Sequence, residues 1–122
     1  MTETKTNILP IVGLTMKSVT RNGDDQITFT TIDGRQFCMD HNQDCCENVV
    51  IEDVCGDLDW LVGSPITQAE ETSRDATGDE VGESGTWTFY RIGTAKGLVA
   101  IRWLGSSNGY YSERVDFREA TK

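Results

Sequence analysis

Alternation of apolar and polar side chains between short glycine-containing turns is the feature that most constrains the fold. It runs through residues 86–117, TWTFYRIGTAKGLVAIRWLGSSNGYYSERVDF, where two turn-like segments separate three segments of strand length. Such alternation places every second side chain on the same face of a sheet. The pattern therefore predicts a three-stranded antiparallel meander made of residues 86–92, 98–104 and 110–117.

The register of this meander follows from matching the apolar faces. A connection through residues 93–97 pairs Trp87 with Trp103 and Phe89 with Ile101. A three-residue loop, Ser107-Asn108-Gly109, then pairs Ile101 with Val115 and Val99 with Phe117. This arrangement places Arg102 opposite Arg114, which is unfavourable for two like charges. The expected core face consists of Trp87, Phe89, Val99, Ile101, Trp103, Val115 and Phe117.

The first third of the chain predicts a second group of strands. Residues 14–21 form a strand whose apolar pattern slips before Val19, and a β-bulge would explain the slip. The next two strands form a hairpin with a three-residue loop, Ile32-Asp33-Gly34. That loop places Phe29 opposite Phe37 and Ile27 opposite Met39, so that all four lie on one face.

The middle of the chain predicts one short helix between strands. Residues 48–54 are apolar and β-branched, as expected of a buried strand. Asp57 is suited to cap a helix that buries Leu58, Leu61 and Val62, and Gly63 to end it. One longer helix from Glu52 is the alternative, although Gly56 disfavours it. Residues 66–72 predict a polar edge strand, and residues 73–85 a mobile loop.

The expected fold class is therefore α+β, mostly antiparallel sheet with one short helix. With 122 residues the chain is long enough for one domain, which we assign to residues 10–119. Residues 1–9 are expected to be flexible, and residues 120–122 to form a tail.

The charge and the cysteines indicate the class of partner and the compartment. A net charge of −9 argues against binding nucleic acid or anionic membranes but permits a basic protein partner or a cation. The N-terminus does not have the pattern of a signal peptide, and no apolar run could span a membrane. We therefore expect a cytoplasmic protein with four free thiols, because a bridge between the adjacent Cys45 and Cys46 would be strained.

Reactive side chains are concentrated in residues 41–63, and Cys38 lies just before them. Cys38, His41, Cys45, Cys46 and Cys55 include zinc-type ligands, but their spacing does not match a standard zinc module, so no metal or cofactor is expected. A second interpretation pairs His41 with Cys45 or Cys46 as a thiolate nucleophile, which would make the protein a small metal- or thiol-dependent enzyme. A third is an acidic DNA mimic.

A protein-binding surface is the leading interpretation. The segments 41–47 and 108–113 hold side chains that strand formation does not require, and we expect them to lie together. Asp44, Glu47 and Glu113 would give this surface a negative rim that favours a basic partner. Tyr90, Leu104 and Arg102 either contribute to binding or pack under the helix. The candidate binding residues are His41, Asp44, Cys45, Cys46, Glu47, Asn108, Tyr110, Tyr111 and Glu113.

Two sequence blocks, H-x-Q-D-C-C-E from His41 and S-N-G-Y-Y-S-E from Ser107, carry a family resemblance. With the segments around them they resemble a family of small uncharacterised proteins found mainly in phages and also in bacteria, domain of unknown function seven-four-four-eight. The resemblance extends over residues 14–117 and supplies no activity. It implies a phage or prophage origin, a cytosolic setting in the bacterial host and an accessory role. The function we expect is that of a non-enzymatic phage-type accessory protein that binds a host macromolecule or small ligand, with inhibition of a host process among its expected effects.

Overall fold

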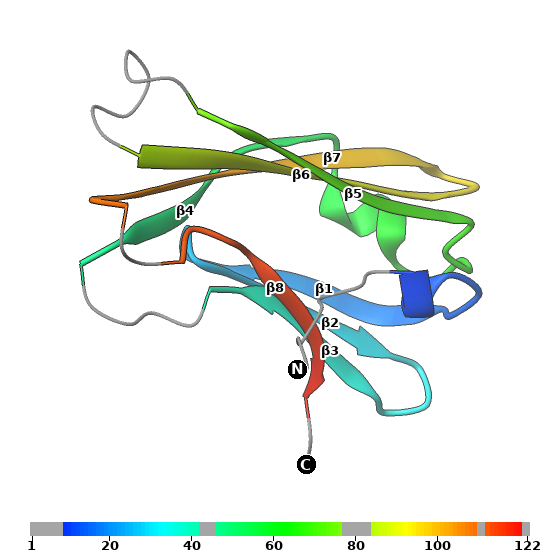
Figure 1. Cartoon of the computed structure of the whole chain (residues 1–122). Coiled ribbons are helices and arrows are strands. Elements are labelled where there is room, and N and C mark those ends of the chain that lie inside the picture. The colour runs from blue at the N-terminus through cyan, green and yellow to red at the C-terminus, as the bar shows by residue number, and fades with distance from the viewer. Residues whose placement is uncertain (1–8, 42–45, 77–83, 110–111, 121–122) are drawn as a thin grey trace.

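Two four-stranded antiparallel sheets are stacked face to face in the computed structural model, which describes residues 9–41, 46–76, 84–109 and 112–120 (Figure 1). The first sheet has the order β1 (Met16–Asn22), β2 (Gln26–Thr31), β3 (Gln36–Asp40) and β8 (Asp116–Ala120). The second has the order β4 (Asn48–Cys55), β7 (Gly97–Ser107), β6 (Ser84–Thr94) and β5 (Gln68–Asp75). The expectation of mostly antiparallel sheet is confirmed.

The helical part of the predicted fold class is minimal. The described residues contain only two short 3₁₀ turns, η1 (Leu9–Ile11) and η2 (Leu58–Leu61), and no α-helix. The predicted ends of η2 are correct: Asp57 caps it by accepting a hydrogen bond from the Asp59 amide (3.0 Å), and Gly63 follows it with a φ of +85°. Strand β4 continues to Cys55, which excludes the longer helix and leaves room for a single turn.

The predicted N-terminal hairpin is confirmed in register. Ile27 lies opposite Met39 and Phe29 opposite Phe37. The Thr31 amide donates to the carbonyl oxygen of Arg35 (2.8 Å), which closes the three-residue loop in which Gly34 has a φ of +94°. Strand β1 has the register shift expected before Val19, between Met16 and Ser18.

The predicted register between β6 and β7 is wrong by one residue. Tyr90 lies opposite Ile101, and Trp87 lies opposite Leu104 instead of Trp103. A shift of one residue exchanges the two faces of a strand. Tyr90 is therefore fully buried, whereas Trp87 lies on the opposite face of β6, as does Phe89, which was also assigned to the core.

The β6–β7 turn is fixed by its contact with η2. The strands pair as far as Thr94 and Gly97, so the turn has two residues in place of the predicted longer connection. The Thr94 hydroxyl donates to the carbonyl oxygen of Trp60 (2.5 Å). A Cβ atom at Gly97 would lie only 2.7 Å from the Trp60 ring, so the ring requires glycine at that position.

The third strand of the predicted meander belongs to the other sheet. Strand β8 pairs with β3, with Phe117 opposite Met39, so the expected pairs Ile101–Val115 and Val99–Phe117 do not form. Phe117 and Val115 are nevertheless buried, as expected. The Phe117 ring stacks on Phe37 (5.7 Å between centroids) and meets Phe29 in a T-shaped, edge-to-face contact (5.5 Å). These ring contacts explain why β8 completes the first sheet.

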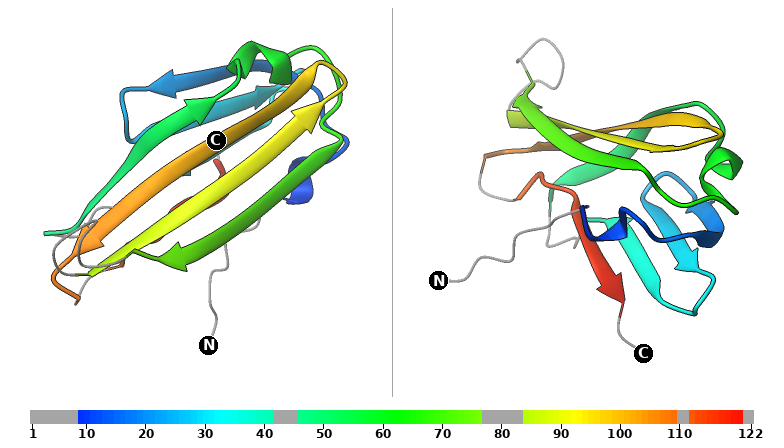
Figure 2. Two further views of the ribbon diagram at one scale, coloured as in Figure 1. Left: turned by 90° about the horizontal axis from the view of Figure 1, so that it is seen from above. Right: turned by 90° about the vertical axis from the view of Figure 1, so that its right-hand side faces the viewer.

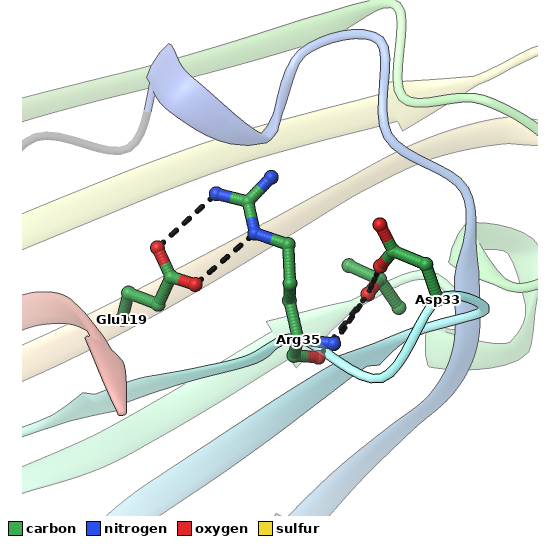
Figure 3. Close-up of polar contacts among 4 residues, drawn as sticks. Asp33, Arg35 and Glu119 are labelled. Atoms are coloured by element: carbon green, nitrogen blue, oxygen red, sulfur yellow. Dashed lines mark hydrogen bonds and ion pairs between the residues drawn. The ribbon is translucent and has the colours of Figure 1, made fainter. Parts of the chain in front are cut away.

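An ion pair holds β8 in register at its exposed end (Figure 3). Arg35 donates two hydrogen bonds to Glu119, Nε to Oε2 (3.0 Å) and Nη2 to Oε1 (3.1 Å). The hydrogen bond from Arg35 lowers the pKa of the Glu119 carboxyl. In the same turn, the Thr31 hydroxyl donates to Asp33. Because both members of the ion pair are half exposed, it contributes more to alignment than to stability.

The inner faces of both sheets form one continuous core. Its largest members include Trp103 and Tyr90, and the Trp103 indole nitrogen donates to the Met39 sulfur (3.3 Å) across the two sheets. Strand β5 lies at an edge, as predicted, although it ends at Asp75. Because β6 begins at Ser84, both ends of the expected loop 73–85 are strand, and residues 77–83 lie outside the described part.

Replacing Phe117 with alanine should lower the free energy of unfolding by about 3–5 kcal/mol, because it leaves a cavity between Phe29 and Phe37. Denaturant unfolding followed by circular dichroism measures the change. The exposed neighbour provides the control: Arg118→Ala should cost about 1 kcal/mol or less. Similar losses for the two variants would contradict the packing of β8.

Candidate functional site

A buried pair of hydrogen-bonded side chains, His41 and Glu47, occupies the start of the predicted site. His41 directly follows β3, and Glu47 directly precedes β4. The Nε2 atom of His41 lies 2.7 Å from Oε2 of Glu47, and Nδ1 lies 2.8 Å from the carbonyl oxygen of Arg114. The exposed fractions of the two side chains are 4% and 0%. Both ring nitrogens of His41 are therefore used inside the protein.

The chemistry of these two contacts determines where the protons lie. A carbonyl oxygen can only accept, so Nδ1 of His41 must carry a proton. Nε2 then either donates to an ionised Glu47 or accepts from a protonated one. In both states the pair holds one proton between Nε2 and Oε2 and has no net charge. This neutrality allows the pair to be buried.

Glu113 anchors the second predicted block. Its carboxylate accepts hydrogen bonds from the hydroxyls of Thr86 (2.8 Å) and Ser107 (2.5 Å). Burial raises the pKa of the Glu113 carboxyl, but hydrogen bonds from Ser107, Ser84 and Thr86 outweigh burial and hold this pKa below its usual value. The Glu113 side chain thus ties the segment 112–115 to the ends of β6 and β7.

Gly105 lets this segment approach β7 closely. A Cβ atom at Gly105 would collide with the carbonyl oxygen and the Cβ of Glu113. The backbone carbonyl oxygen of Arg114 accepts a hydrogen bond from His41. The backbone carbonyl oxygen of Val115 accepts a weak hydrogen bond from the Tyr90 hydroxyl (3.5 Å). We call this unit, formed by His41, Glu47, Gly105 and residues 112–115, the crossover joint.

The crossover joint brings the His41 and Glu113 blocks together, as predicted, but two of the three carboxylates expected at its negative rim make contacts within the protein. Glu47 is buried against His41, and the oxygens of Glu113 accept hydrogen bonds from β6 and β7. Cys46 and Asn108 are exposed. Asp44, Cys45, Tyr110 and Tyr111 lie outside the described residues.

The expectation of four free thiols is wrong for Cys46, which forms a disulfide, whereas Cys38 and Cys55 are free thiols. Within the described ranges, no group of three or more histidine, cysteine or carboxylate side chains is arranged to hold a metal ion. A polar hollow of about 340 Å³ lies beside the joint. Its lining residues are Asp25, Gln26, Asp40, His41 and Val49.

The sequence analysis missed a second surface, the outward side of the sheet β4-β7-β6-β5, which we call the outer face. None of the described elements covers it (Figure 2, left). Trp87 lies there between two arginines, with the guanidinium carbons of Arg102 and Arg74 at 5.1 and 5.7 Å from its ring centroid. Phe89 stacks beside it at 6.3 Å. The like-charge pair Arg102–Arg114 was a signal against the predicted pairing of residues 98–104 with 110–117, but not against the β6–β7 register that assigned Trp87 to the core.

Replacing Glu47 with alanine should lower the free energy of unfolding by about 3–5 kcal/mol, because the partner of a buried histidine is lost. Glu47→Gln should cost less, since the amide can donate to Nε2 while Nδ1 still donates to Arg114. Chemical denaturation compares both variants with Glu119→Ala, which removes an exposed ion pair and should cost about 1 kcal/mol or less. A cost for Glu47→Ala no larger than that of Glu119→Ala would show that the joint is not structural.

Glu113 should make stability depend on acid pH. Because its folded pKa is depressed, its contribution is complete above the unfolded value of about 4.5 and is lost as the pH falls through the folded pKa. The stability difference between the wild type and Glu113→Gln should therefore shrink on acidification below about pH 5. Thermal melts at a series of pH values test this, and parallel profiles for the two proteins would contradict it.

No helix in the described part of the chain is long and apolar enough to cross a membrane. Comparison with curated proteins found no match, and comparison with solved structures found none either. A family model described as "Domain of unknown function (DUF7448)" matches residues 9–117, nearly the whole of the 122-residue chain. This protein therefore belongs to the DUF7448 family.

Proposed function

We propose that this chain is a non-enzymatic accessory protein of phage type that binds a macromolecule of its bacterial host in the cytoplasm and thereby inhibits a host process. The phage setting comes from the resemblance carried by the H-x-Q-D-C-C-E and S-N-G-Y-Y-S-E blocks. Binding, as opposed to catalysis, is supported by how the structure uses its reactive side chains and by what it leaves on the surface.

The reactive side chains have structural roles. The only histidine of the chain uses both ring nitrogens within the crossover joint. A general base needs a ring nitrogen that can reach a substrate proton. Cys46 is in a disulfide, so it offers no thiolate nucleophile. The enzyme alternative built on His41 and Cys45 or Cys46 therefore loses its support at two of its three residues.

The observation that carries the proposal is the composition of the outer face. Trp87 stacks with Phe89 and with two arginines on a sheet surface that no described element covers. Tryptophan and arginine are the residue types most enriched among those that dominate binding energy at protein interfaces. Trp87 and Phe89 are half-buried, so part of each ring remains accessible to a partner.

The test is capture of a host partner by the immobilised full-length chain, followed by mass spectrometry of the intact complex. We expect a partner in defined stoichiometry, with capture reduced about tenfold or more in a Trp87→Ala/Phe89→Ala variant that melts cooperatively. Ile32→Ala is the matched control, since Ile32 is an exposed apolar residue (68%) in the β2–β3 turn.

Two outcomes would overturn the proposal. One is that host lysate yields no partner in defined stoichiometry. The other is that Trp87→Ala/Phe89→Ala and Ile32→Ala retain the partner equally well. The intact mass also reports any bound metal ion, which would revive the enzyme alternative.

A further inference from the structure

The outer face is organised in rows that the strand register defines. Burial alternates along β7, and its outward positions are Leu98, Ala100, Arg102 and Leu104. Cross-strand pairing places them beside outward residues of β4, β6 and β5. The three central rows, from β4 to β5, are Val50–Leu104–Trp87–Arg74, Asp53–Arg102–Phe89–Thr72 and Cys55–Ala100–Arg91–Glu70.

Arg102 is positioned to bind an external anion. Stacking on Trp87 orients its guanidinium group, and its side chain is 47% exposed. Its one ion pair, with Asp53, is loose at 4.0 Å, and it donates no hydrogen bond within the described residues. Guanidinium groups held on an aromatic ring lose little freedom when they bind a carboxylate through two parallel hydrogen bonds.

Basic side chains are concentrated on the outer face relative to the whole protein. Its three central rows hold three arginines, at positions 74, 91 and 102, and two carboxylates, Asp53 and Glu70, and the exposed Glu52 lies in the bulge between the first two rows. Acidic and basic groups are therefore balanced among these residues, on a chain whose net charge is −9. This contrast favours a negatively charged group at the outer face and disfavours it on the rest of the surface.

The apolar residues indicate which kind of anionic partner fits. Val50 and Leu104 continue the surface of Trp87 across three strands, and Leu98 is 46% exposed at the far end of β7. Val50, Leu104 and Trp87 lie in the row next to Arg102, which matches a protein segment that carries acidic side chains beside apolar ones.

We propose that the outer face docks an acidic segment of a partner protein, with a carboxylate bound by Arg102 and apolar side chains packed on Val50, Leu104 and Trp87. This inference rests on the proposed function and names the partner's chemistry. Nucleic acid is disfavoured, because a long polyanion would also meet the negative charge elsewhere on the chain.

The probe is a fluorescent decapeptide of alternating glutamate and valine, compared with a lysine–valine decapeptide and a single-stranded DNA decamer. Anisotropy titrations against the full-length chain should show binding of the glutamate peptide in preference to the other two. Arg102→Gln should weaken binding about tenfold, as expected for loss of one charge-assisted bidentate contact. Arg102→Lys should bind the peptide with intermediate affinity, because lysine keeps the positive charge but cannot donate two parallel hydrogen bonds to one carboxylate.

Lys17→Gln is the matched control, since Lys17 is an exposed cation on β1 of the other sheet. If Lys17→Gln weakens peptide binding as much as Arg102→Gln does, the effect comes from net charge alone, and the proposal is overturned. Tighter binding of the DNA decamer, or self-association of the wild type in sedimentation that Trp87→Ala/Phe89→Ala abolishes, would also overturn it. Host-partner capture that survives Arg102→Gln, with no binding of the glutamate peptide, would leave the proposed function standing and overturn only the acidic segment.

Discussion

The stacking of the two sheets depends on the segment between β7 and β8, where the chain crosses back from the second sheet to the first over Gly105. The segment 112–115 lies so close to β7 that no side chain could occupy this position, and Glu113 is tied down there by hydroxyls of β6 and β7. From this crossing the chain reaches the open edge of β3 and becomes β8, which completes the first sheet. His41 and Glu47 support the same crossing from the opposite side, through the carbonyl oxygen of Arg114.

Local rules were sufficient where the apolar pattern allows only one register. The hairpin around Gly34, the bulge before Val19 and the capping of η2 by Asp57 and Gly63 all follow from turn chemistry and alternation. In each case a one-residue error would have moved apolar side chains to the solvent or removed a residue suited to positive φ. Alternation was therefore a reliable guide in these segments.

The same rules failed where two registers bury similar amounts of apolar surface. Strand β6 is apolar on both sides, with Trp87 and Phe89 on one and Tyr90 and Ile92 on the other, so alternation alone could not choose its inner face. The choice depends on the contact of Trp60 with Gly97, between segments distant in sequence. The pairing of β8 with β3 likewise depends on aromatic contacts that no local pattern reveals.

The sequence likewise predicted some features of the candidate site and missed others. The sequence indicated correctly that His41 and Glu113 belong to segments that meet, because neither is needed to form a strand. It could not show that Glu47 would be paired with His41 in the interior instead of facing a partner. The outer face was missed because the one-residue error in the predicted β6–β7 register had assigned Trp87 and Phe89 to the core.

The position of β8 in the first sheet has a consequence for how the chain folds during synthesis. Strands β1–β3 emerge early, yet the edge of β3 stays unpaired until residues 116–120 have been made. All four strands of the second sheet are made between β3 and β8. Until residues 116–120 have left the ribosome, β3 therefore presents backbone groups to which another strand could bind.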